Sequence, residues 1–91
     1  MGLMRTDLSG ANLSGANFSK ADLGRALMRF AHLTGANLAG AQLTGADLSG
    51  ADLTGADLTG ADATEADFDD AVLTSARGLD TVKGLKPPKR R

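Results

Sequence analysis

Alanine recurs at every fifth position along most of this chain, and this period excludes the common ways of folding it. The alanines run from Ala11 to Ala76, fourteen times without a gap. On an α-helix a step of five residues turns the chain by about 140°, so such a residue would be spread around all sides. In a flat strand the side chains alternate with a period of two, so a period of five changes face at every step. Neither a helix nor a flat sheet therefore buries these alanines together.

A second apolar column follows two residues after each alanine, and it is mostly leucine. A polar residue, often Asp or Asn, stands between the two columns, and the unit is Ala-(Asp/Asn)-Leu-(Ser/Thr)-Gly. Within one extended unit, Ala and Leu point to the same side because they are two positions apart. The Ser/Thr-Gly pair then turns the chain, since Gly readily adopts positive φ. Repeated corners therefore wind the chain into a coil with Ala and Leu inside.

These units resemble the repeat of the pentapeptide-repeat proteins, most cleanly over residues 46–60, and the resemblance covers about residues 6–80. It implies an all-β fold, a right-handed quadrilateral parallel β-helix in which four units form one coil. The spacing alone predicts the coil but not the number of its sides. With four sides we expect about 3.5–4 coils, residues twenty positions apart stacked on one another, and coils at the ordinary spacing of β-strands.

The repeat decays near the C-terminus, so we divide the chain into a β-helix over residues 1–78, a C-terminal cap over 79–85 and a basic tail over 86–91. Stacked coils expose unpaired backbone groups at their ends unless something covers them. After residue 78, apolar residues recur every three positions, which favours a short helical or irregular lid. We expect the tail to be flexible, or alternatively to bind acidic protein, nucleic acid or lipid. Its basic residues are Lys86, Lys89, Arg90 and Arg91.

The N-terminal end of the coil lacks a comparable lid in the sequence. Met1, Leu3 and Met4 begin almost inside the first coil. An uncovered apolar end favours association, so we expect an end-to-end homodimer through these three residues. The alternative is that Met1 and Met4 fold over the end themselves.

Acidic residues are concentrated in one part of the chain, although the net charge is only −1. Residues 47–70 carry eight acidic and no basic side chains. Most of them occupy the polar position of successive units, so a coil spreads them into a belt. The belt consists of Asp47, Asp52, Asp57, Asp62, Glu65, Asp67, Asp69 and Asp70.

The resemblance brings one specific partner into consideration, because some pentapeptide-repeat proteins that bind DNA gyrase are held to mimic duplex DNA with an acidic rod. Duplex DNA carries one charge per about 1.7 Å of its axis, so a mimic needs negative charge along its whole length. Here the belt spans little more than one coil and is flanked by net-positive segments. Gyrase is therefore a possible partner that the sequence does not favour. The alternative is that Asp is the solvated outer residue that this turn tolerates.

The unit at residues 26–30 departs most from the repeat. Leu27 replaces the polar residue and Phe30 replaces the glycine of the corner, beside Arg25, Arg29 and His32. We expect Leu27 and Phe30 to point outward, and an exposed apolar pair among arginines is typical of a small interaction site. The alternative is that these side chains pack against neighbouring coils.

The composition excludes most chemistry. Without cysteine there is no disulfide, thiolate zinc site or cysteine nucleophile, and this absence fits a reducing cytoplasm. One histidine, expected on the surface, builds no familiar zinc site, and neither a catalytic triad nor a phosphate-binding loop is indicated. No apolar run approaches the roughly 18 residues of a transmembrane span. We therefore predict a cytoplasmic protein that is not an enzyme and has no catalytic, cofactor-binding or metal site.

These observations together predict a non-catalytic protein–protein interaction or scaffold module, built as a rigid β-helical rod, whose protein partner the sequence does not identify. The alternative is a DNA-mimic modulator of a type II topoisomerase, which would inhibit or protect gyrase.

Overall fold

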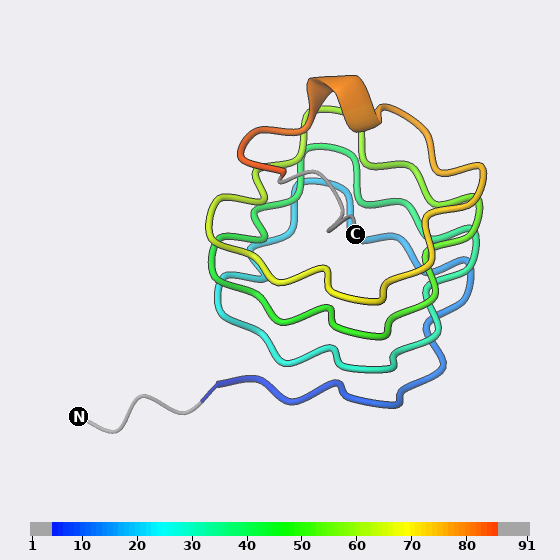
Figure 1. Ribbon diagram of the computed structural model, residues 1–91, viewed down its shortest axis with the longest axis vertical. Helices are drawn as coiled ribbons and strands as arrows, with labels where there is room; N and C mark the ends of the chain where they lie inside the picture. Colours follow the sequence, from blue (N-terminus) through cyan, green and yellow to red (C-terminus); the bar gives the residue numbers. More distant parts are fainter. Residues whose placement is uncertain (1–4, 86–91) are drawn as a thin grey trace, which may run out of the picture.

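The computed structural model describes residues 5–85, which form one continuous coil whose successive turns lie side by side (Figure 1). Isolated parallel bridges join neighbouring turns, and all but the last join residues twenty positions apart, as Asn12 with His32 and His32 with Asp52. Twenty residues are four units of five, so the expected stacking of residues twenty apart is confirmed. The chain is thus a β-helical solenoid in which each side is a column of stacked units.

Main-chain hydrogen bonds hold each side of a coil to the next coil in both directions. The amide of Leu13 donates to the carbonyl of His32 at 2.7 Å, and the amide of His32 donates to the carbonyl of Ala11 at 2.8 Å. Only one residue per side forms a bridge, because a corner follows at once. Within residues 5–85 there is accordingly neither an α-helix nor a strand longer than a single bridge.

Every corner from residue 10 to residue 75 has the same backbone geometry. The last residue of each unit has a φ between 58° and 73°, and the next alanine donates back to the leucine position, as Ala16 does to Leu13 at 3.0 Å. A hydrogen-bonded turn with positive φ at its third residue is typical of type II, which suits glycine. Six corners nevertheless carry a side chain: Lys20, Arg25, Phe30, Glu65, Asp70 and Ser75.

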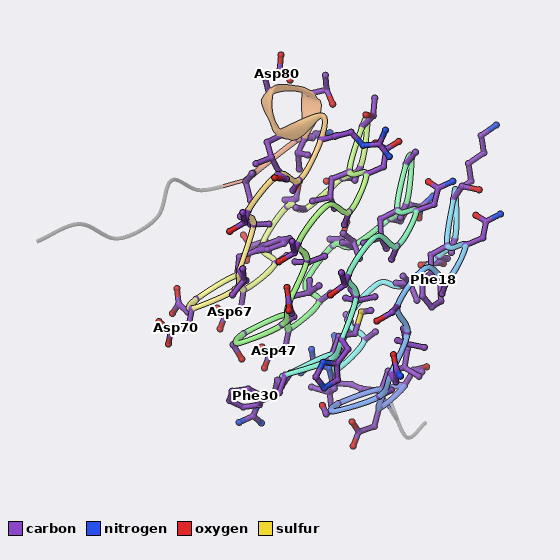
Figure 2. All side chains as sticks on the ribbon, turned by 90° about the vertical axis from the view of Figure 1, so that its right-hand side faces the viewer. Phe18, Phe30, Asp47, Asp67, Asp70 and Asp80 are labelled. Carbon is purple, nitrogen blue, oxygen red and sulfur yellow. The ribbon has the colours of Figure 1, made fainter. Side chains whose placement is uncertain are left out.

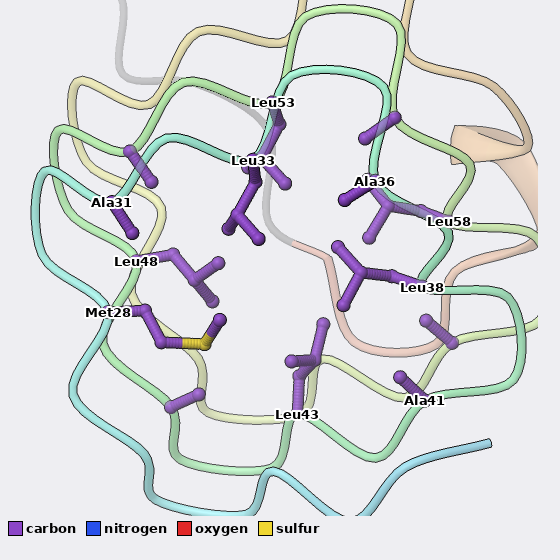
Figure 3. Close-up of a cluster of buried hydrophobic side chains, with 14 of the residues drawn as sticks. Met28, Ala31, Leu33, Ala36, Leu38, Ala41, Leu43, Leu48, Leu53 and Leu58 are labelled. Carbon is purple, nitrogen blue, oxygen red and sulfur yellow. The ribbon is translucent and has the colours of Figure 1, made fainter. Parts of the chain in front are cut away.

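The alanine and leucine columns form the core, while polar side chains project outward (Figure 2). Between residues 26 and 63 each apolar inward side chain is at most 1% exposed. Figure 3 shows Leu33, Leu38, Leu43 and Leu48 pointing inward from different sides of the coil. The predicted core columns are therefore confirmed. The outer coils are only partly covered, at Leu8, Leu13, Phe18 and Leu23 on one end and at Phe68 and Leu73 on the other.

The C-terminal end of the coil is partly covered by the 3-10 helix η1, Leu79–Thr81. Leu79 and Val82 pack against the enclosed core. The hydroxyl of Thr81 accepts a hydrogen bond from the amide of Gly60 at 2.8 Å and donates one to the carbonyl of Gly78 at 2.6 Å. This packing is consistent with a cap, whose bounds stay a prediction.

Two of the expected interaction sites lie outside residues 5–85. One is the dimer contact of Met1, Leu3 and Met4. The other is the basic tail with Lys86, Lys89, Arg90 and Arg91.

We expect Leu53→Ala to lower the free energy of unfolding by about 2–5 kcal/mol, because it leaves a cavity in the core, where Leu53 is fully enclosed. Leu13→Ala is the matched control, since Leu13 occupies the same column in an outer coil and is only partly buried. The free energy of unfolding should fall clearly less in this control than in Leu53→Ala. Chemical denaturation followed by circular dichroism measures both variants, and equal losses would contradict the enclosed position of Leu53.

Gly55→Ala tests the corner geometry by itself. Gly55 has a φ of 70°, and an added Cβ would meet no atom within 4 Å. The left-handed conformation is then the only source of strain, and we expect a loss of about 1 kcal/mol. Gly78→Ala should lose more stability than Gly55→Ala, because an added Cβ there would lie 2.6 Å from the Cα of Thr59. Denaturation curves compare the two variants, and an unchanged stability of Gly55→Ala would argue against the importance of positive φ.

Candidate interaction site

One face of the coil carries the main departures from the repeat. It consists of residues 6–10, 26–30, 46–50 and 66–70, which parallel bridges join in this order. We call it the Phe30 face. From here on, residues 26–30 are its basic row, residues 46–50 its middle row and residues 66–70 its acidic row.

Phe30 is the most prominent apolar side chain on this face. It is 66% exposed, and Figure 2 shows it projecting from the coil. Its φ of 58° lies in the left-handed region, where a bulky residue is an outlier. The ring lies over the next coil, since a Cβ added to Gly50 would come within 2.4 Å of it. Phe30 thus points outward, as expected, and its position depends on the glycine twenty residues later.

Leu27 differs from Phe30, because it is half-buried. Its backbone bridges Asp7 and Asp47 on the two neighbouring coils, and its amide donates to the carbonyl of Thr6 at 2.7 Å. The expectation that Leu27 points outward is therefore met only in part. Its partial burial agrees with the alternative that this side chain packs against neighbouring coils.

The basic members of the predicted patch are all exposed. Arg29 lies on the Phe30 face, with its Nε 3.7 Å from Oδ2 of Asp47. Arg25 occupies the corner before the basic row, and its Cγ would lie 3.4 Å from a Cβ added to Gly45. His32 lies around the next corner, on the neighbouring face. The five predicted residues therefore belong to three consecutive units, and only Leu27, Arg29 and Phe30 lie within the Phe30 face.

Arg5 is a contributor that the sequence analysis missed. Its Nε donates to the carbonyl of Arg25, and a terminal nitrogen donates to the carbonyl of Gly45 at 3.1 Å. The side chain thus crosses two corners of one column and ties the first coil to the next two. The available signal was that position 5 stands twenty residues before Arg25 and forty before Gly45.

The carboxylates of the belt are partly used by the turns themselves. The amide and hydroxyl of Thr54 donate to Oδ1 of Asp52 at 3.0 and 2.6 Å. First the hydroxyl and then the amide of Thr54 hold the pKa of Asp52 below its usual range. The same pair of bonds occurs at Asp57 and Asp62, with the same effect on their pKa values.

Asp47 forms these bonds as well. Burial raises the pKa of Asp47, but the hydrogen bonds from Ser49 and the nearby Arg29 outweigh this and lower it overall. Asp47 therefore also stays ionised while it holds its own turn.

The belt runs around the coil rather than along it. Asp47, Asp52, Asp57 and Asp62 lie on four successive faces, where they are half-buried. Basic residues lie beside two of them. Nη2 of Arg77 lies 3.9 Å from Oδ2 of Asp57, and the backbone of Lys83 forms a bridge with that of Asp62.

The remaining acids of the belt are exposed and cluster at and beside the acidic row of the Phe30 face. They are Glu65, Asp67, Asp69 and Asp70.

No group of three or more His, Asp or Glu side chains in residues 5–85 could hold a metal ion. In the same residues, no helix has the length and apolar character needed to cross a membrane.

Comparison with known proteins identifies the repeat. The family model of pentapeptide repeats matches the chain in 8 copies, over residues 3–29, 11–50, 21–60 and 51–77. No curated protein sequence matches the chain.

Solved structures agree with the family match. Rfr23, a pentapeptide repeat protein from the cyanobacterium Cyanothece 51142, is 33% identical, with a TM-score of 0.52 over 85% of this chain and 63% of its own. The chain thus spans less than two thirds of Rfr23. The pentapeptide repeat protein alr5209 from Nostoc Pcc 7120 is 34% identical, with a TM-score of 0.50 over 90% of this chain and 78% of its own.

The hydrogen bonds to Asp52 predict a pH dependence of stability. Because folding lowers the pKa of Asp52, its stabilising effect is complete above about pH 4 and is lost as the pH falls through the folded pKa. Thr54→Val removes one donor, so it should melt below the wild type at neutral pH and approach it at low pH. Thr74→Val is the control, since Thr74 follows Val72 in the same column and has no carboxylate to lose. Melting temperatures from pH 2 to 7 measure this, and a pH-independent difference for Thr54→Val would contradict it.

Proposed function

Because the chain belongs to the pentapeptide-repeat proteins, we propose that it is a non-catalytic interaction module whose Phe30 face binds a protein partner. The observation that carries this proposal is Phe30 itself, an aromatic ring that is 66% exposed at a strained corner. We further propose that the β-helix is right-handed, that it contains about 3.5–4 coils and that a cap over residues 79–85 closes it.

The energetics of the corner favour a role for the ring. An L-residue in the left-handed conformation costs about 1–2 kcal/mol relative to a relaxed backbone, and the exposed ring of Phe30 recovers little of this by burial. Most corners avoid the strain with glycine. Strain that folding does not require is a reason to suspect function.

The surroundings of Phe30 resemble an interaction hot spot. Aromatic and arginine side chains dominate such sites, and Phe30 is flanked by Arg25 and Arg29. The ring is held on Gly50, so less conformational entropy is lost when a partner binds.

The alternative function, mimicry of DNA toward a type II topoisomerase, has weaker support. Phosphates run along the axis of DNA, whereas the belt here runs around the coil and its carboxylates are engaged by their own turns. A gyrase supercoiling assay separates the two proposals. Inhibition or protection of gyrase at micromolar protein would favour mimicry, and no effect would favour the interaction module.

Phe30→Gly tests the proposed function. It removes the ring and relieves the corner strain, so the variant should be at least as stable as the wild type. The matched control is Ser75→Gly, which relieves the same kind of strain at φ 59° on another side of the coil. Affinity capture from cells of the source organism, with quantified bound protein, should show partner loss of at least tenfold for Phe30→Gly only. Equal capture by the two variants, or no specific capture by the wild type, would overturn the proposal.

A further inference from the structure

Two rows of the Phe30 face carry opposite charges, and residues 6–10, with exposed Asp7, lie beyond the basic one. Arg29 lies in the basic row and Arg25 at the corner before it. Exposed Asp67 and Asp70 lie in the acidic row, and Glu65 lies at the corner before that row. Figure 2 shows Phe30, Asp67 and Asp70 along the same side of the molecule. The two rows are separated by two coil steps, about 10 Å at ordinary strand spacing. The face is therefore a short, ordered dipole.

The middle row separates these charges and carries one of its own, Asp47, which is paired with the basic row. Asp47 is half-buried and lies 3.7 Å from Arg29, and its Oδ1 accepts hydrogen bonds from Ser49. Gly50 carries no side chain and is covered by the ring of Phe30. The middle row is consequently the natural position for a symmetry axis.

We propose that a second copy of this chain docks on the Phe30 face, antiparallel to the first, with a two-fold axis lying in the face along the middle row. Rotation about this axis exchanges the basic and acidic rows but leaves each column in place. Arg25 and Glu65 belong to one corner column, twenty residues on either side of Gly45, so Arg25 of one copy faces Glu65 of the other. Arg29 likewise faces the end of the acidic row, beside Asp70 of the second copy.

The charge order selects this arrangement over its parallel counterpart. A two-fold axis along the coil would place arginines against arginines and carboxylates against carboxylates, and like charges in contact oppose association. An unrelated partner would need both charge clusters at the same spacing and in inverted order. A second copy of the chain has both charge clusters at the required spacing, since it has the same sequence. The two-fold axis then makes each contact twice.

The expected complex is weak and depends on salt. One side of a coil this short offers far less than the roughly 1,200–2,000 Å² that specific, stable interfaces bury in total. Its exposed charge pairs are screened by salt. The proposal uses the same face as the proposed function, but its own basis is the order of charges along that face.

Two charge-reversed variants test the proposal. The first is Arg25→Glu with Arg29→Glu, and the second is Glu65→Lys with Asp70→Lys. All four side chains are exposed, so both variants should fold, which circular dichroism and melting curves check. At low salt, sedimentation velocity of the wild type should show self-association that grows with concentration. This association should disappear in 0.5 M salt, because the Debye length shrinks from about 30 Å at 0.01 M to about 4 Å at 0.5 M.

Each variant alone should associate at least tenfold more weakly than the wild type, and an equimolar mixture of the two should recover association as a heterodimer. The matched control is Lys20→Glu with Lys83→Glu, which changes the net charge as the first variant does but at exposed positions off the Phe30 face. It should associate like the wild type.

A wild type that stays monomeric at millimolar concentration, or folded variants whose mixture does not associate, would overturn the proposal. Variants that each associate like the wild type would place the contact elsewhere, as at Met1, Leu3 and Met4. These outcomes do not decide the capture experiment with Phe30→Gly, because that experiment measures the binding of a partner protein and not of a second copy of this chain. The two proposals therefore fail independently.

Discussion

The turn that closes each unit determines the rest of this structure. It makes a corner in the chain after a short extended segment, so each side of the coil forms only one bridge to the next coil, as at Asn12 and His32. Its positive φ is kept at every corner from residue 10 to residue 75, with or without glycine. Because the backbone groups pair with the coil twenty residues away, the coils are held together mainly by the backbone, and side-chain links such as that of Arg5 are additions to it. The outward side chains are the positions at which this chain can vary its surface.

The core could be predicted from the sequence because the period of five encodes it directly. The column that contains Leu33 and Leu53 follows from repetition alone, and both side chains are enclosed as expected. The clasp made by Arg5 could not be predicted in this way, because it depends on how corners of three coils lie next to one another. The same holds for Leu27, which is half-buried at its place between Asp7 and Asp47 on the two neighbouring coils. A linear pattern gives columns, but contacts between columns require the three-dimensional stacking.

The acidic belt shows why charge counted along a sequence differs from charge presented by a surface. Asp52 and Asp57 accept hydrogen bonds from their own turns, and these bonds keep the carboxylates ionised but partly enclosed. The signal for this role, Asp followed two residues later by Ser or Thr, was present in the sequence and is the ordinary pattern of an Asx turn. The belt is therefore first a property of the turns, and only Glu65 and the acidic row extend it into a charged surface.

Five of the six corners that carry side chains fall into two groups with different surroundings. Lys20, Arg25 and Phe30 each lie close to the glycine twenty residues later, so their side chains run along the coil. Glu65 and Asp70 stand on the last full coil, where no such glycine follows, and they are exposed. The corners thus carry basic and aromatic groups on the earlier coils and carboxylates on the last full coil. Since the backbone between them is fixed by its turns, these groups are presented without the ordering of a loop, which lowers the entropic cost of binding.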